Sequence, residues 1–138
     1  MFLHAVQPHV RECVGVEFDE RYAQYARDVI GIPTHTNPLG ANGFSPHTFD
    51  MISVLEVLEH IEHPRVFLGE VKRYLKPDGL VYIEVPNHDD ILLSLVDVPG
   101  YRDFYYRQPH VFYYNPHTLR LLMRQMGFDG DITASGFE

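Results

Sequence analysis

The stretch that decides the fold is FDMISVLEVLEHIEHP, residues 49–64. Its first seven residues, 49–55, form a short apolar run with β-branched members, which is typical of a strand buried on both faces of a sheet. Pro64 presets the first turn of a helix that we expect to run to about Leu75. A strand followed closely by a helix is the unit from which parallel α/β sheets are built.

The same alternation continues outward from this stretch. Asp19 can cap a helix over residues 20–30 and Gly31 can end it, while Asn115-Pro116 opens a last helix that stops at Gly127. Residues 2–8 look like the end of a helix. The segment Lys76-Pro77-Asp78-Gly79 predicts a turn with the glycine in the left-handed region. The other expected strands are residues 13–18, 32–36, 80–85 and a short one near 130–135.

These elements predict a doubly wound α/β fold with a mostly parallel sheet, covered by helices on both faces. The chain has 138 residues, which suits a single domain spanning 1–138. A helical face of Tyr22, Ala23, Ala26, Val29 and Ile30 is expected to point inward from the helix over 20–30.

The acidic composition excludes one class of partner. The formal net charge is −8, from 19 acidic and 11 basic residues with no basic run, so a phosphate backbone finds no complementary surface. No apolar stretch approaches the length of a membrane span, and the first residues lack the pattern of a signal peptide. We therefore expect a cytoplasmic protein with no nucleic-acid or membrane partner. Cys13 is the only cysteine, and its apolar surroundings favour a buried small side chain.

Ligands of open parallel sheets bind beyond the carboxyl ends of the strands, so residues just after each strand are the candidates for function. Glu17 follows the strand over 13–18. A carboxylate in that place can accept two hydrogen bonds from a ribose diol. On this feature alone, it is equally consistent with the sequence that Glu17 only caps the junction of strand and helix.

Three segments taken together resemble the class I S-adenosylmethionine-dependent methyltransferases, in the branch that acts on small molecules. They are VGVEFD with Ala26-Arg27, the stretch 49–64 quoted above, and LKPDGL with Val85-Pro86-Asn87. A further segment, from His110 through Asn115-Pro116 to Gly127-Phe128, is similar to the part of that branch that reads His, aromatics, capped helix and Gly-Phe. The resemblance implies methyl transfer from S-adenosylmethionine, the cofactor, to a small-molecule acceptor.

The resemblance also implies roles for single residues. Glu17 would bind the ribose hydroxyls, Asn37 would approach the adenine edge, and Leu55 and Glu56 would line the cofactor. His60 and His110 are the candidate catalytic residues. If the reaction needs a general base, imidazole can accept a proton near neutral pH.

One part of the family pattern is missing. The resemblance implies a first strand followed by a run such as Gly-x-Gly-x-Gly, because only glycine lets the backbone approach the cofactor closely. The segment Gly40-Ala41-Asn42-Gly43 cannot replace this glycine run, because it follows the third strand of the family pattern and not the first. We therefore expect a chain truncated at the first strand, with sheet edges that could pair directly or in a homodimer. A non-catalytic remnant or interaction module is the alternative function, and a nucleotide-binding oxidoreductase is a further one.

Two other patterns have competing interpretations. His60 and His63 are three residues apart, but Pro64 follows at once and no third ligand stands at a recognisable spacing, so we expect no metal. Seven aromatic residues between Tyr101 and Tyr114 are consistent with a lid over an acceptor, or equally with apolar cover or a dimer contact.

Overall fold

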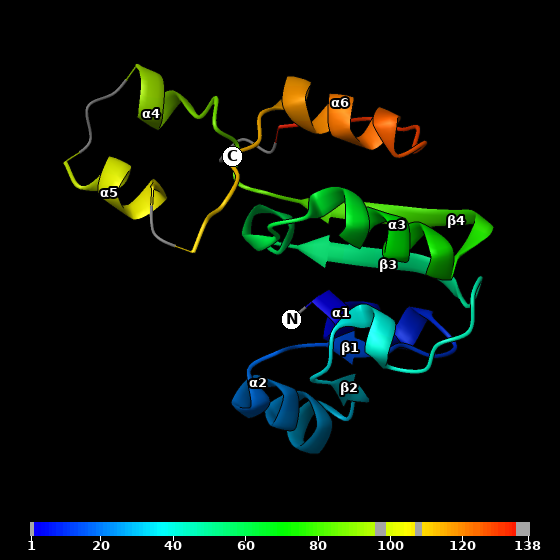
Figure 1. Ribbon diagram of the computed structural model, residues 1–138. Coiled ribbons are helices and arrows are strands. Elements are labelled where there is room, and N and C mark those ends of the chain that lie inside the picture. The colour runs from blue at the N-terminus through cyan, green and yellow to red at the C-terminus, as the bar shows by residue number, and fades with distance from the viewer. Residues whose placement is uncertain (1, 96–98, 107–108, 135–138) are drawn as a thin grey trace. The chain divides into compact units, whose positions relative to one another are not determined.

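The computed structural model describes residues 2–95, 99–106 and 109–134 (Figure 1). The chain divides into two compact units, Met1–Ser45 and Pro46–Glu138. Each unit contains one pair of strands, and both pairs are parallel. The predicted α/β class with parallel strands and intervening helices is thus confirmed.

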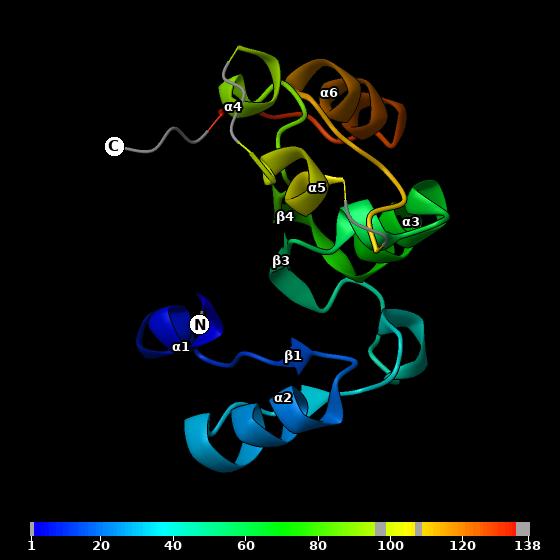
Figure 2. The same cartoon turned by 90° about the vertical axis from the view of Figure 1, so that its left-hand side faces the viewer.

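The first unit places a short strand pair beside a helix (Figure 2). Parallel pairing joins Gly15 to Thr34 and Val16 to His35. A Cβ on Gly15 would lie 3.0 Å from the hydroxyl of Thr34, so the strands approach closely at the glycine. The elements are α1 (Phe2–Val6), η1 (Gln7–His9), β1 (Gly15–Val16), α2 (Glu20–Tyr25), η2 (Ala26–Ile30), β2 (Thr34–His35) and η3 (Leu39–Ala41).

The ends of the α2 helix follow the sequence prediction, whereas its buried face does not. The Asp19 side chain accepts a hydrogen bond from the Arg21 amide at 2.9 Å, and Gly31 ends the following π-helical turn at a φ of 78°. Ala23 is fully buried, but Tyr22 and Val29 are 65% and 64% exposed. The expectation that both point inward was wrong, and at Val29 the π-helical turn changes the angular spacing of the side chains that the prediction assumed.

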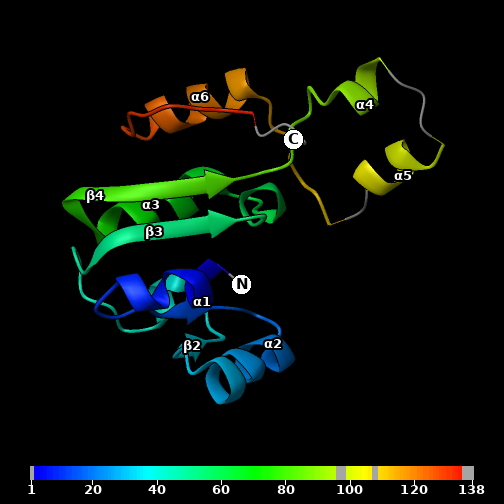
Figure 3. The ribbon, with the colours of Figure 1, turned by 180° about the vertical axis from the view of Figure 1, so that it is seen from behind.

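The second unit is built on a longer parallel pair. Met51 to Leu55 of β3 pair in register with Leu80 to Glu84 of β4. Helix α3 covers one face of this pair, as the views from opposite sides agree (Figure 3). The elements are β3 (Phe49–Leu55), η4 (Leu58–His60), α3 (Pro64–Tyr74), β4 (Leu75–Glu84), α4 (Ile91–Ser94), α5 (Tyr101–Tyr105) and α6 (Pro116–Gln125).

The core of this unit lies between α3 and the strands. Leu58, Leu68 and Val71 are fully buried, and Val54 is 4% exposed. The spacing of Leu68, Val71 and Tyr74 along α3 fixes the face of that helix that packs on the sheet. The expectation of burial on both strand faces was wrong at Met51, which is 42% exposed.

The predicted turn before β4 is a bulge inside a continuous strand. Phe49 pairs with Leu75 and Met51 with Leu80, so the four residues 76–79 of β4 lie opposite the single residue Asp50 of β3. The prediction that Gly79 lies in the left-handed region was wrong. Its lack of a side chain is needed for another reason, since a Cβ would lie 3.0 Å from the Leu75 side chain and from the Lys76 carbonyl oxygen.

The carboxyl-terminal helix α6 begins as predicted. Asn115 Oδ1 accepts from the Thr118 amide at 2.9 Å, and Thr118 Oγ1 accepts from the Asn115 amide at 3.0 Å, which completes a capping box. Gly127 follows the helix at a φ of 73°. The strand expected near 130–135 was wrong over its described part, because residues 130–134 form no strand. Within the described ranges, none of the helices is long and apolar enough to cross a membrane.

Candidate functional site

In the first unit, two candidate residues follow strands that end at the same edge of the sheet. Glu17 comes directly after β1 and Asn37 lies two residues after β2, and both are exposed. Glu17 Oε1 accepts a hydrogen bond from the Asp19 amide at 2.9 Å, which orients the carboxylate at the strand end. The Asn37 backbone carbonyl accepts from the Asn42 side chain at 3.2 Å.

In the second unit, the edge beyond β3 is formed by Leu55 and Glu56. Leu55 is the last residue of β3 and is half-buried, whereas Glu56 is exposed. Glu56 has a φ of 52°, which a residue with a side chain adopts at a cost of about 1 kcal/mol. Its amide donates to the Glu84 carbonyl oxygen at 3.0 Å, so the strand pairing holds this conformation. Strained backbone of this kind is concentrated at functional sites.

Beyond Glu56, the η4 turn is bonded to a segment about fifty residues away. The Glu59 carbonyl oxygen accepts from the amides of Val111 and Phe112, at 2.8 and 3.1 Å. The His60 ring contributes a third bond from its Nδ1 to the Pro109 carbonyl oxygen at 2.6 Å. We call these three bonds the η4 clamp. It brings the two predicted catalytic histidines together, with the rings of His60 and His110 4.9 Å apart.

The Glu59 side chain is the least expected member of this region. Glu59 is 1% exposed, and its carboxylate oxygens have no hydrogen-bond donor among the described residues. The Nε2 atom of His60 lies 3.7 Å from Oε1 of Glu59. Burial and then the Glu59 charge raise the pKa of Tyr114 to about 12. Glu59, His60 and His110 each place one carboxylate oxygen or ring nitrogen within 4.8 Å of the others.

Aromatic side chains gather next to this cluster. The Tyr105 ring stacks on Tyr113 with centroids 5.7 Å apart, and the Tyr106 hydroxyl lies 3.1 Å from Nε2 of His88. His110 also contacts Tyr113, at 5.8 Å between centroids. Burial raises the pKa of Tyr105. The predicted aromatic segment thus borders the histidine pair, and its role as lid or as apolar cover stays a prediction.

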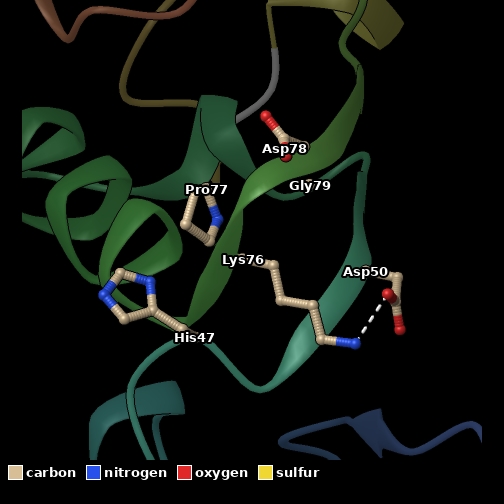
Figure 4. A pocket seen from close by; sticks show the side chains of 6 residues that line it. All are labelled: His47, Asp50, Lys76, Pro77, Asp78 and Gly79. Atoms are coloured by element: carbon tan, nitrogen blue, oxygen red, sulfur yellow. Dashed lines mark hydrogen bonds and ion pairs between the residues drawn. The ribbon is translucent and has the colours of Figure 1, made fainter.

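Two surface hollows lie within the second unit. One, of about 460 Å³, is formed at the bulge inside β4, where the Lys76 ammonium pairs with Asp50 at 2.6 Å (Figure 4). It lies at the amino ends of the strands, opposite to the edge at which parallel sheets bind ligands. The other, of about 360 Å³, lies beside His60 and is lined by the start of α3.

Sequence reasoning named His60 and His110 but missed Glu59. An acid placed between apolar Leu58 and a histidine, in a stretch otherwise rich in apolar residues, is the signal that could have found it. A carboxylate and two imidazoles lie close together here, so the expectation that the protein binds no metal stays a prediction.

Parallel strands with exposed acids at their carboxyl ends are typical of α/β proteins that bind nucleotide-like ligands. Comparison with known proteins specifies the family. The sequence profile of the methyltransferase domain matches residues 1–131, so the chain belongs to that family.

Individual relatives agree with this assignment. The ubiquinone biosynthesis O-methyltransferase of Caulobacter vibrioides is 30% identical over 76 residues, which is 55% of this chain and 29% of that protein. A similar fold is found in a SAM-dependent methyltransferase from Archaeoglobus fulgidus, with a TM-score of 0.73, 18% identity and coverage of 93% of this chain and 56% of the other. A possible histamine N-methyltransferase from Thermotoga maritima has a TM-score of 0.71 at 22% identity, covering 91% and 58%. The chain thus spans less than a third of that curated relative and somewhat over half of these solved chains.

Proposed function

We propose that this chain carries out methyl transfer from S-adenosylmethionine to a small-molecule acceptor. The observation that carries the proposal is the match to the methyltransferase domain over residues 1–131, together with a strained, exposed Glu56 at the end of β3. S-adenosylmethionine supplies an activated methyl group, so the protein's own contribution is alignment of the acceptor and exclusion of water.

The residues present fit the chemistry of that cofactor. Glu17 offers an exposed carboxylate with one oxygen, Oε1, already oriented by the Asp19 amide, which suits hydrogen bonds from a ribose diol. Asn37 carries an exposed amide that can pair with an adenine edge. Leu55 and Glu56 would line the cofactor with an apolar surface and a carboxylate. The roles of all four stay predictions.

The acceptor is proposed to be a small molecule with an oxygen, nitrogen or carbon nucleophile. The name of the curated relatives supports an oxygen acceptor, since they are O-methyltransferases of ubiquinone biosynthesis. The ring cluster of Tyr105, Tyr106 and Tyr113 supports a planar acceptor, because aromatic faces stack on one another favourably. A cytoplasmic location, a homodimer and the lack of a nucleic-acid or membrane partner stay predictions.

The test is calorimetric titration of S-adenosylhomocysteine into the 138-residue chain. We expect measurable binding, which Glu17→Ala weakens by about 10-fold, because loss of a charge-assisted hydrogen bond typically costs 1 to 3 kcal/mol. Glu12→Ala is the matched control, since it removes an exposed carboxylate upstream of β1. It should leave the affinity unchanged.

Two results would contradict the proposal. Equal affinity of Glu17→Ala and the parent protein would remove Glu17 from the cofactor site. The complete lack of binding by a folded chain would support the alternative, a non-catalytic remnant or interaction module.

A further inference from the structure

We propose that the outward face of α2 and η2 is a self-association surface, at which a second copy of this chain binds in antiparallel orientation. The surface consists of Phe18, Tyr22, Tyr25 and Val29, which we call the α2 stripe. It lies entirely within the first compact unit. The inference goes beyond the proposed function and does not depend on it.

The α2 stripe is apolar and open to solvent. Its four residues, in chain order, are 64%, 65%, 55% and 64% exposed. They follow one another at intervals of four, three and four, a spacing that places side chains along one side of a helix. The opposite side is the one that packs, since Ala23 is fully buried and Arg27 donates to the Thr34 carbonyl oxygen at 2.9 Å. A contiguous row of large apolar side chains on the outside of a domain marks an interaction surface.

The spacing of the stripe fits a second copy of itself. The intervals of four, three and four are symmetric about the midpoint between Tyr22 and Tyr25. A second copy in antiparallel orientation therefore sets Tyr22 of one chain against Tyr25 of the other, and Phe18 against Val29. A two-fold axis through the midpoint makes both halves equivalent, which is the geometry of most homodimers. Tyrosine and phenylalanine are also among the residues that are enriched at protein interfaces.

The charges beside the stripe complement each other in the same arrangement. Arg21 lies next to it, with the guanidinium carbon 5.9 Å from the centroid of the Tyr22 ring. Asp28 is exposed and forms no ion pair with another described residue. Each of the two precedes a stripe residue directly, so both lie on the same flank, and antiparallel helices bring like flanks together. Arg21 of each copy thus meets Asp28 of the other, which gives two equivalent ion pairs.

Arg21 has donors to spare for this contact. Its Nε and Nη2 atoms donate to the Asp19 carboxylate, at 3.1 and 2.6 Å. A guanidinium carries five N–H donors, so the hydrogens of Nη1 stay available for a second carboxylate. The helix cap formed by Asp19 and the contact with a second copy are therefore compatible.

The size of the stripe sets the strength of the association. An aromatic side chain presents about 150 to 250 Å², so the exposed parts of three rings and one valine amount to about 400 Å² per copy, or about 800 Å² for a pair. Stable complexes bury about 1,200 to 2,000 Å². The net charge of −8 on each copy adds a repulsion that physiological salt largely screens. We therefore expect a reversible dimer with a Kd above about 1 µM.

Sedimentation equilibrium of the 138-residue chain, from about 2 to 500 µM, measures this Kd. Val29→Ser should raise the Kd at least about 10-fold, because the symmetric dimer loses the apolar contact twice. Val66→Ser is the matched control. Val66 is 66% exposed on α3, close to the 64% of Val29, and its replacement should leave the Kd within two-fold. Circular dichroism confirms that both variants keep their helix content.

Charge reversal tests the orientation. Arg21→Glu and Asp28→Arg should each raise the Kd about 5-fold or more, because each places like charges opposite one another in the dimer. The double variant should return the Kd to within two-fold of the parent protein. Arg120→Glu, on the exposed side of α6, changes the net charge as Arg21→Glu does and should have little effect. The loss of the contact between Arg21 and Asp19 is common to the single and double variants, so it cannot produce the rescue.

Three results would overturn the inference. They are a parent protein that stays monomeric at every concentration, a dimer that Val29→Ser leaves unchanged, and a failure of the double charge reversal to restore what either single reversal weakens. The second result would locate self-association at another surface, such as a sheet edge. Titration of S-adenosylhomocysteine tests the proposed function by a separate measurement, so either proposal can fail without the other.

Discussion

Replacing the Tyr114 hydroxyl with hydrogen should stabilise this protein, and increasingly so at alkaline pH. Tyr114 is 6% exposed, and its hydroxyl has no hydrogen-bond partner among the described residues. A buried polar group without a partner typically destabilises a fold by 1 to 3 kcal/mol. Tyr114→Phe removes that penalty while it preserves the ring, so we expect the free energy of unfolding at pH 7 to rise by about 1 kcal/mol.

The pH dependence follows from the direction of the pKa shift. Burial, with a smaller contribution from the Glu59 charge, raises the pKa of Tyr114 from 10.0 to about 12. A raised pKa in the folded state means that the contribution to stability is complete below pH 10 and is lost as the pH rises toward 12. Allowing for solvent screening, this loss amounts to about 1 to 2 kcal/mol. Tyr114→Phe lacks it, so its advantage over the parent protein should widen between pH 9 and 11.5.

Urea unfolding of both proteins at pH 7, 9 and 11.5 measures the difference. Tyr22→Phe is the matched control, because Tyr22 is 65% exposed and should show no change at any of the three values. A loss of more than about 1 kcal/mol in Tyr114→Phe at pH 7 would refute the reasoning. It would mean that the hydroxyl makes a hydrogen bond in solution.

Two further predictions concern α6 and the histidine pair. Asn115→Ala should lower the free energy of unfolding by about 1 kcal/mol, since it removes the side-chain acceptor for the Thr118 amide, whereas His117→Ala in the same exposed turn should not; urea titration distinguishes the two. His110→Ala should lower turnover about 10-fold or more with little change in S-adenosylhomocysteine affinity, as measured by calorimetry. Joint collapse of folding and cofactor binding in that variant would mark His110 as a structural residue.

Local patterns in the sequence were sufficient for strand β3 and for the helix ends. The bounds of β3 agree with the apolar run, and Asp19, Gly31 and Asn115 act as the caps that their residue types indicate. These features depend on neighbours within a few positions, which is why a single sequence reveals them.

Features that depend on distant contacts were not predictable in the same way. The bulge at 76–79 arises from the register of two strands, and the turn chemistry of its residues gives no information about that register. His60 and His110 were named through a family resemblance, but only the fold shows that they are adjacent. Glu59 was missed because its burial depends on the folded structure, in which its backbone carbonyl is bonded to Val111 and Phe112 far along the chain.

The η4 clamp also bears on how such a protein can change over evolutionary time. It joins residues 49 positions apart, and α4 and α5 lie in the part of that stretch that follows β4. The entropy lost on closing a flexible loop grows only with the logarithm of its length, so doubling the part after β4 would cost about 0.6 kcal/mol. Insertions and deletions there leave the strand register and the clamp intact. Such a segment can change while the pair of His60 and His110 is kept in place at its base.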